Sequence, residues 1–225
     1  MAEAFVLAAF AALLGAVLLL SRRRQGRVLA RRAALLDPCR RLFADTRLRC
    51  DAFGFPRMAG TRDGLSYDIQ IVPDALAVRK LPALWLLVSL PQSMPVAFTL
   101  HLMLRPTGAE GFTRFRSLPN QHDLPAGFPA DAALRSDDPV ALALAPLLQP
   151  LVTLWGDTLK EIILSPKGLR LTLLLEEADR KTYLILRETD LGQTPVNPAA
   201  LSRALDALAG LRAALHAPAP ERQVA

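Results

Sequence analysis

Residues 4–20 form an unbroken apolar stretch, and Arg22, Arg23 and Arg24 follow one residue later. An α-helix rises about 1.5 Å per residue, so about 20 apolar residues cross a hydrocarbon core about 30 Å thick. This stretch is at the short end of that range, so the Arg22 side chain is expected to extend into the headgroups. The pattern predicts a single-pass transmembrane anchor over residues 1–21.

The residues around this stretch indicate its orientation. A cleaved signal peptide has positive charge before its apolar core and small residues at the cleavage site after it. Here Glu3 is the only charged side chain before the core, and the arginine triplet stands where cleavage would occur. Flanking arginines hold their end of a span in the cytoplasm. We therefore expect an uncleaved signal anchor with the N-terminus outside and the domain in the cytoplasm. Abundant alanine, arginine, leucine and proline are compatible with a high-GC bacterium, which suggests the bacterial inner membrane.

A basic segment over residues 22–49 follows the anchor. It reads as a continuing helix to about Phe43, with Leu35 and Leu36 among its few apolar residues. Asp37-Pro38 is expected to interrupt it, because the residue before a proline disfavours helical geometry. We expect this segment to lie along the membrane surface.

Strand patterns dominate residues 52–104. Leu65, Tyr67 and Ile69 alternate with polar residues, the period of two that a half-buried strand requires. Residues 53–58 are the expected partner strand. The apolar run over residues 81–90 is too short to cross a membrane and predicts a buried central strand. A further alternating strand is expected over residues 96–104.

The middle of the chain is less regular. Residues 106–129 are rich in glycine and proline, and a long loop in a compact domain is a preferred place for a binding surface. A helix is predicted over residues 138–155, with Asp138 as its N-cap and with Pro146 and Pro150 dividing it. A second membrane segment over residues 140–155 stays an alternative, although the prolines and the acidic flanks argue against it.

The last part predicts a hairpin of residues 159–164 and 169–175, a third strand over 182–187 and a final helix that Asn197 caps. These elements predict an α+β fold, in which an N-terminal single transmembrane helix precedes an antiparallel-sheet domain covered by helices. The expected organisation is an anchor at 1–21, a basic juxtamembrane segment at 22–49, a globular domain at 50–216 and a disordered tail at 217–225.

The net charge of +6 is concentrated near the anchor. Residues 50–225 hold 17 basic and 18 acidic residues, so the domain lacks the basic face that nucleic-acid binding requires. The basic residues beside the anchor are expected to attract anionic lipid headgroups. The membrane anchor flank consists of Arg22, Arg23, Arg24, Arg27, Arg31 and Arg32.

Residue types that carry chemistry are few and scattered. Cys39 and Cys50 have no neighbouring histidine, so they are expected to be free thiols in a reducing cytoplasm and not zinc ligands. His101 is expected to be half-buried on a strand. Phosphate-binding, dinucleotide-binding and hydrolase motifs do not occur. The sequence therefore predicts no catalytic residue, no cofactor and no metal site, and it leans against an enzyme.

Two clusters combine basic and aromatic side chains, one before the central strand and one in the long loop. Such clusters suit an acidic partner or a lipid headgroup, although charged strand ends and loops pinned by phenylalanine give the same pattern. The candidate interaction surface is Arg79, Lys80, Trp85, Phe112, Arg114, Phe115, Arg116 and His122.

The predicted anchor and the lack of catalytic motifs favour a membrane protein that recruits or scaffolds a protein partner. The alternative is a module that senses lipid headgroups or a small molecule. A second alternative is an enzyme acting on a membrane-associated substrate, with an unrecognised site around His101, His122 and Asp123.

Overall fold

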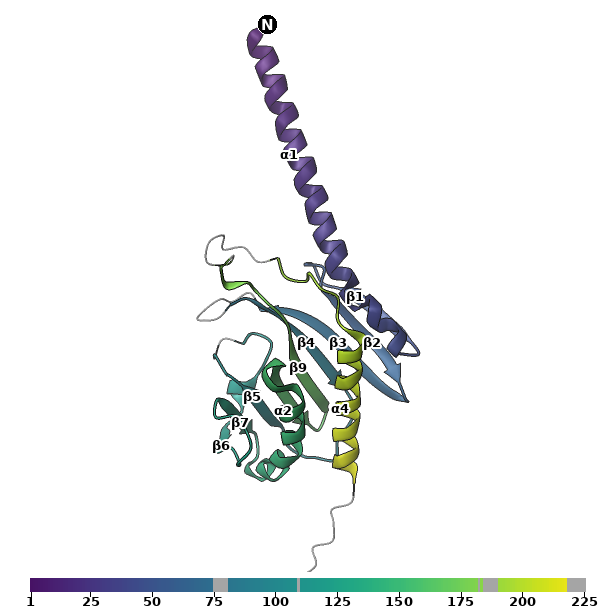
Figure 1. The fold of residues 1–225 in the computed structure, drawn as a ribbon, viewed down its shortest axis with the longest axis vertical. Helices are drawn as coiled ribbons and strands as arrows, with labels where there is room; N and C mark the ends of the chain where they lie inside the picture. Colours follow the sequence, from purple (N-terminus) through teal and green to yellow (C-terminus); the bar gives the residue numbers. More distant parts are fainter. Residues whose placement is uncertain (75–80, 109, 182, 184–189, 218–225) are drawn as a thin grey trace, which may run out of the picture.

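The computed structural model describes residues 1–74, 81–108, 110–181, 183 and 190–217, with the backbone alone for residues 2–4, 6–8 and 11. Within these residues, nine strands form one antiparallel sheet in the order β1-β2-β3-β4-β9-β8-β5-β7-β6 (Figure 1). The strands are β1 (Thr46–Cys50), β2 (Pro56–Arg62), β3 (Leu65–Asp74), β4 (Ala83–Leu90), β5 (Leu100–Leu104), β6 (Asn120–His122), β7 (Ala132–Ser136), β8 (Leu159–Ser165) and β9 (Gly168–Glu177).

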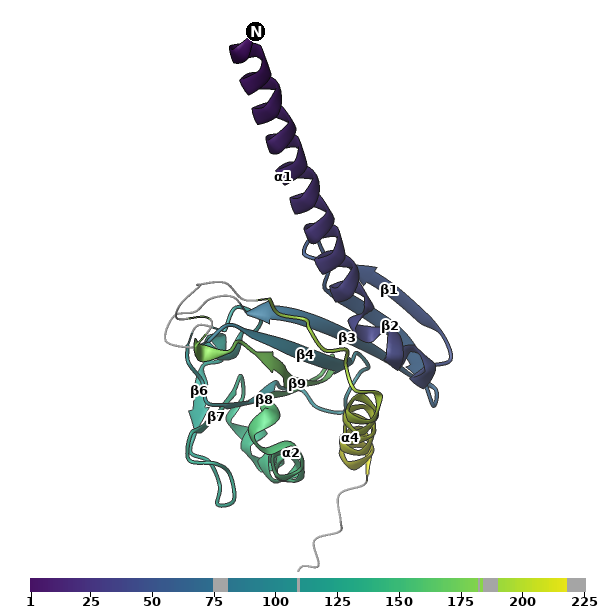
Figure 2. The ribbon, with the colours of Figure 1, turned by 45° about the horizontal axis from the view of Figure 1, so that its top comes forward.

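Helices occupy one face of this sheet, and one long helix projects away from it (Figures 1 and 2). The α-helices are α1 (Ala2–Ala33), α2 (Gln149–Trp155) and α4 (Pro198–His216), and the 3-10 helices are η1 (Ala34–Leu42), η2 (Phe115–Ser117), η3 (Pro139–Leu148) and η4 (Gly156–Thr158). The structure thus confirms the α+β class and the antiparallel sheet with helices.

The main core lies between the sheet and η1, η3, α2 and α4. Leu84, Leu86 and Val88 of β4 point into this core, whereas Trp85 and Leu87 join a second apolar cluster on the opposite face. All eight residues of β4 are buried, because helices cover one face and the segment after β5 covers part of the other. The predicted buried central strand is confirmed.

Helix α1 is 32 residues long, and its N-terminal part projects away from the domain (Figure 1). Large apolar side chains are exposed along its first two-thirds; they are Phe5, Phe10, Leu13, Leu14, Val17, Leu18, Leu19 and Leu20. That this helix crosses a membrane stays a prediction. By length and composition, the helical stretch within the described residues that could cross one is Pro139–Thr158. Leu148, Leu151 and Val152 of that stretch pack in the domain core.

Part of the predicted juxtamembrane segment lies in the domain. Leu35, Leu36 and Cys39 of η1 are fully buried, and the Leu35 carbonyl accepts a hydrogen bond from the Val196 N–H at 2.9 Å. The predicted interruption at Asp37-Pro38 is wrong. The chain changes from α to 3-10 geometry at Ala34, and Pro38 lies inside the 3-10 helix η1. The sheet then starts at β1.

The strand limits differ from expectation at several places. The partner of β3 is β2 at Pro56–Arg62, and β1, β6 and β7 are additional strands. Strand β5 begins at Leu100, four residues later than predicted. The helix predicted over 138–155 is divided into η3 and α2, as its prolines indicated. The strand predicted over residues 182–187 lies outside the described residues.

The two cysteines differ in accessibility. Cys39 is fully buried, its thiol donates a hydrogen bond to the Val196 carbonyl at 3.5 Å, and burial raises its pKa to about 11 against the smaller opposing effect of Arg41. Cys50 is exposed. Since the thiolate is the reactive form, a maleimide at neutral pH should modify only Cys50 in the folded protein. Mass spectrometry would count one adduct, none in Cys50→Ser, and two after denaturation. Two rapid adducts in the native protein would contradict the burial of Cys39.

Candidate functional site

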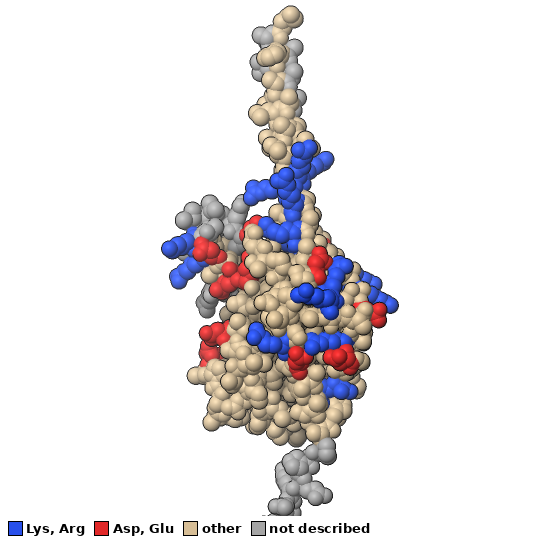
Figure 3. Space-filling view, turned by 45° about the vertical axis from the view of Figure 1, so that its right-hand side comes forward, with Lys and Arg blue, Asp and Glu red and all other residues tan. Residues whose placement is uncertain are grey.

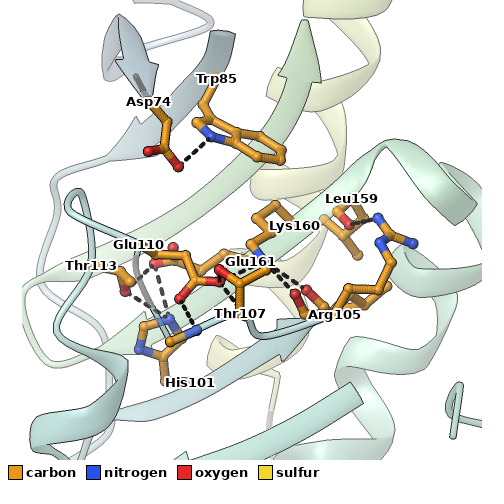
Figure 4. Close-up of polar contacts among 12 residues, drawn as sticks. Asp74, Trp85, His101, Arg105, Thr107, Glu110, Thr113, Leu159, Lys160 and Glu161 are labelled. Carbon is orange, nitrogen blue, oxygen red and sulfur yellow. Dashed lines mark hydrogen bonds and ion pairs between the residues drawn. The ribbon is translucent and has the colours of Figure 1, made fainter. Parts of the chain in front are cut away.

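A buried polar cluster lies between the sheet and the segment that joins β5 to β6, residues 105–119. Its sheet residues belong to β3, β4, β5 and β8, and Glu110 and Thr113 come from the loop (Figure 4). Phe112 and Phe115 of the same loop pack on the sheet residues Trp85 and His101. The sequence predicted this long loop as the preferred place for a binding surface. In the structure the inner side of the loop packs on the sheet.

A β-bulge in β8 positions two of the side chains that the sheet contributes to this cluster. The register between β8 and β9 shifts between Leu159 and Glu161, so Lys160 has no cross-strand counterpart. A bulge re-aims the side chains next to it. Lys160 and Glu161 are consecutive, yet both side chains point toward the loop (Figure 4). The bulge therefore brings a buried cation and a buried anion to one face.

The Lys160 ammonium fixes both ends of the loop's first turn. Its Nζ lies 2.9 Å from Glu110 Oε1, and both side chains are 5% exposed. The same ammonium donates hydrogen bonds to the carbonyls of Leu104 at 3.1 Å and Arg105 at 2.7 Å. The N–H groups of Thr107 and Gly108 donate to the Glu110 carboxylate at 2.6 and 3.0 Å. The turn is thus closed on itself and tied to β8.

These contacts explain the acidity of Glu110. Burial by itself raises the pKa of this carboxyl, but the hydrogen bonds from Thr107 and Lys160 outweigh it and lower the pKa to about 2. Charge-assisted hydrogen bonds of this kind stabilise the ionised form. Glu110 is therefore a carboxylate at any physiological pH.

A second buried pair joins β5 to β8. His101 Nε2 lies 2.9 Å from Glu161 Oε1, and the two side chains are 3% and 0% exposed. The Thr113 hydroxyl donates to Glu161 Oε1 at 3.3 Å, and the Phe115 ring stands edge-on to the imidazole at 5.0 Å between centroids. His101 is fully buried, more deeply than the sequence indicated.

Trp85 completes the cluster from β4. Its indole N–H donates to Asp74 Oδ2 at 3.4 Å, and its ring packs on Phe112 at 5.7 Å between centroids. Lys160 Nζ lies 6.0 Å from the centre of the same ring. A cation near an indole face is attracted by its quadrupole. The aromatic residues that the sequence assigned to a surface thus hold the loop on the sheet.

Two polar atoms in this region have no hydrogen-bond partner among the described residues. They are Glu161 Oε2 and Thr172 Oγ1, whose residues are cross-strand neighbours in β8 and β9. A histidine beside a carboxylate can exchange protons when substrate reaches it. His101 is closed to solvent here, and no catalytic site is evident in the part of the chain that the structure describes. Among the described residues, no group of His, Cys, Asp and Glu is placed to hold a metal ion.

The other candidate interaction residues are dispersed. Arg114 and Arg116 are exposed on the outer side of the loop. His122 lies in β6, where its Nε2 is 2.6 Å from the Ser136 hydroxyl, which in turn donates to the Asp138 carbonyl at 2.6 Å. Arg79 and Lys80 fall outside the described residues. The structure therefore brings Trp85 and Phe112 into contact, packs Phe115 on His101, and places His122 beside Ser136.

The basic residues of the membrane anchor flank have two different environments. Arg31 donates to the Gly192 carbonyl at 3.0 Å and pairs with Asp190, and Arg32 donates to the carbonyls of Leu191 at 3.1 Å and Phe53 at 3.2 Å. These two arginines join α1 to the domain. Burial alone raises the pKa of Asp190, but the hydrogen bonds from Arg31 and Gln193 and the positive charges of Arg31 and Arg32 together outweigh it, and the pKa is lowered.

The remaining flank residues extend into solvent. Arg22, Arg23, Arg24 and Arg27 are exposed, and they have no hydrogen bond or ion pair with another described residue. Figure 3 shows basic side chains gathered where α1 leaves the domain. Among the six flank arginines, all of which are described, these four are therefore free to meet an external ligand.

An apolar groove of about 480 Å³ lies at the far end of the domain from α1. Its lining includes no charged side chain among the described residues. It is formed by residues 95–98, by Val140, Ala143, Leu144 and Leu147 of η3, and by Ala214, Leu215 and Ala217 at the end of α4. Val140 is 68% exposed, so this surface is open to a partner.

Comparisons with known proteins give a likeness in structure but none in sequence. No protein-family model matches this chain, and no curated protein sequence matches it. The solved structure of the mycobacterial trehalose monomycolate transport factor A, TtfA, is similar to 86% of this chain and 98% of its own, with 12% sequence identity and a TM-score of 0.44.

Proposed function

We propose that this chain is a membrane-anchored interaction protein whose domain lies at the cytoplasmic face of a bacterial inner membrane. The observation that carries the proposal is the exposed apolar surface along the first two-thirds of α1. The helix itself continues without a break into the folded domain. Apolar side chains such as Leu14 and Leu18, each at least 50% exposed, favour removal from water. A bilayer provides that burial around a single helix.

Extraction at alkaline pH tests the anchor. The full chain should stay with the membrane pellet, whereas the double variant Leu14→Arg, Leu18→Arg should be released. Each arginine near the centre of a span costs about 2.5–3.5 kcal/mol on insertion scales. Phe53→Arg is the control, because Phe53 is also exposed and apolar but lies on the domain. Release of the unsubstituted chain would refute the anchor.

Cys50 provides a natural probe of orientation because it is the exposed thiol of the pair. In intact spheroplasts, a membrane-impermeant maleimide should leave Cys50 unmodified, and it should react after lysis. Cys50→Ser sets the background. Reaction in intact spheroplasts would place the domain outside and would refute the cytoplasmic assignment.

The interaction role is supported by the apolar groove. Its uncharged lining favours an uncharged occupant, and the helix-in-groove mode buries one apolar face of a partner segment. We propose that an apolar segment of a partner protein binds there, held at a fixed place relative to the membrane.

Substitutions at the groove test this role in the full chain. Val140→Asp and Ala143→Asp alter exposed side chains, so the fold should persist while a bound protein is lost from the detergent-purified complex. Phe53→Asp should retain that protein. A partner retained equally by all of these variants would not use the groove, and the interaction surface would lie elsewhere.

A further inference from the structure

One face of α1 is lined by cationic side chains just after its apolar stretch. Leu20, Arg23, Arg24, Arg27 and Arg31 follow the helical spacing that puts residues on one face. Together with Asp190 from the segment before α4, they line a cavity of about 550 Å³. Arg22 is two residues from Leu20, a rotation of about 200°, so it lies on the opposite side of the helix.

The charge of this cavity is not neutralised from within the described chain. Asp190 is the acidic lining residue, and its ion pair goes to Arg31. Arg23, Arg24 and Arg27 have no hydrogen bond or ion pair with any described residue. The cavity therefore presents three unpaired guanidinium groups, which suit a phosphate group through paired N–H donors.

The place of the cavity along α1 indicates the source of that phosphate. Arg27 follows Leu20 by seven residues, about 10 Å along the axis. If the apolar stretch spans the bilayer, this part of the helix lies at headgroup depth. Leu20 then forms the apolar end of the cavity, where acyl chains begin.

We propose that this cavity is a binding site for an anionic phospholipid headgroup, with Arg23, Arg24 and Arg27 as phosphate ligands. The inference rests on the proposed function, because it takes the anchor to be in the membrane. It adds that one face of the helix binds the lipid. A diffuse attraction by all basic residues of the flank would instead depend on Arg22 as much as on Arg27. Arg31 and Asp190, which pair with each other, line the cavity together with the three ligands.

Native mass spectrometry of the full chain in a neutral detergent tests the site, with phosphatidylglycerol as the probe. Each arginine near an anionic surface contributes about 1 kcal/mol, or about fivefold in affinity. Arg24→Gln, Arg27→Gln together should weaken binding at least tenfold, whereas Arg22→Gln should change it less than twofold. Higher salt should weaken the parent's binding.

Three results would overturn the site. Equal losses in Arg22→Gln and Arg27→Gln would show diffuse attraction, and equal binding of zwitterionic phosphatidylcholine would show no selection for net negative charge. Displacement of the lipid by millimolar inorganic phosphate would assign the cavity to a free anion. Because the measurement is made in detergent, it is independent of alkaline extraction, so failure of the anchor and failure of the lipid site are distinguishable.

Discussion

Lys160→Met should lower the free energy of unfolding by about 3–5 kcal/mol, the usual cost of removing one partner of a buried ion pair. The ammonium and the Glu110 carboxylate are 2.9 Å apart and almost wholly buried. Without the ammonium, a buried carboxylate loses its counter-charge, and the carbonyls of Leu104 and Arg105 lose a donor. Urea unfolding in mild detergent, followed by tryptophan fluorescence, measures the change.

The double variant Lys160→Met, Glu110→Gln separates the ion pair from packing. Removing both charges leaves no uncompensated carboxylate, so the double variant should be more stable than Lys160→Met alone. A loss below about 1 kcal/mol in Lys160→Met would mean that the pair is solvated and that the loop does not depend on it.

Lowering the pH should also remove the stability that the pair of Lys160 and Glu110 contributes. The pKa of Glu110 is lowered to about 2 from its ordinary value near 4.5, so its ionised form is favoured by folding. Its contribution is complete above pH 4.5 and is lost as the pH falls toward 2. The shift corresponds to about 3 kcal/mol. Between pH 5 and pH 2, the parent should therefore lose more stability than Glu110→Gln does, and parallel pH profiles would contradict the assignment.

Gly168→Ala is the second substitution with a large expected effect. Gly168 ends the turn between β8 and β9 with a φ of +145°, a conformation that side chains rarely adopt. An added Cβ would overlap the backbone carbonyl oxygen of Leu90 and lie 3.1 Å from Pro91 Cα. The backbone at the end of β4 would have to move, so we expect a loss of at least about 2 kcal/mol in urea unfolding.

Gly210→Ala is the matched control for this substitution. Gly210 is exposed in α4, and nothing lies within 4 Å of the position that its Cβ would take. Alanine is favoured over glycine in a helix by about 1 kcal/mol, so this variant should be more stable than the parent. Equal effects of the two substitutions would contradict the close approach of the turn to Leu90.

Local sequence rules were sufficient for the regular elements. The alternation in β3, the apolar run of β4 and the capping residues of η3 and α4 act over a few residues, and the structure contains each of these elements. Asp138 and Asn197 accept hydrogen bonds from the N–H groups of Val140 and Ala199, both at 2.9 Å, as N-caps do.

The elements that differ depend on distant contacts. β1 has the sequence TRLRC, whose two arginines resemble the basic segment before it, and its pairing with β2 makes it a strand. Val96 and Phe98 alternate as strand residues do, yet they line the apolar groove before β5 begins. Local periodicity gives no information on which surface an apolar residue will meet.

The polar cluster could not be predicted for the same reason. Lys160 and Glu110 are fifty positions apart, and a lysine next to a glutamate in a strand ordinarily reads as one solvent-facing residue and one inward-facing residue. The bulge places both side chains on the loop side. The sequence assigned Phe115 of the long loop and Trp85 of β4 to an interaction surface, whereas both side chains are buried in the structure.

The unbroken connection of α1 to the domain has a consequence for association. Arg31 and Arg32 secure the last turn of the helix to the segment at residues 190–192, with no flexible linker between them. In an anchored domain of this kind, the orientation of the domain relative to its membrane helix would be fixed on folding, before any partner binds. The entropic cost of orienting the two molecules in an encounter would then be smaller. Lengthening α1 by one residue would turn the domain by about 100° about the helix axis and so present a different surface to a neighbour in the same membrane.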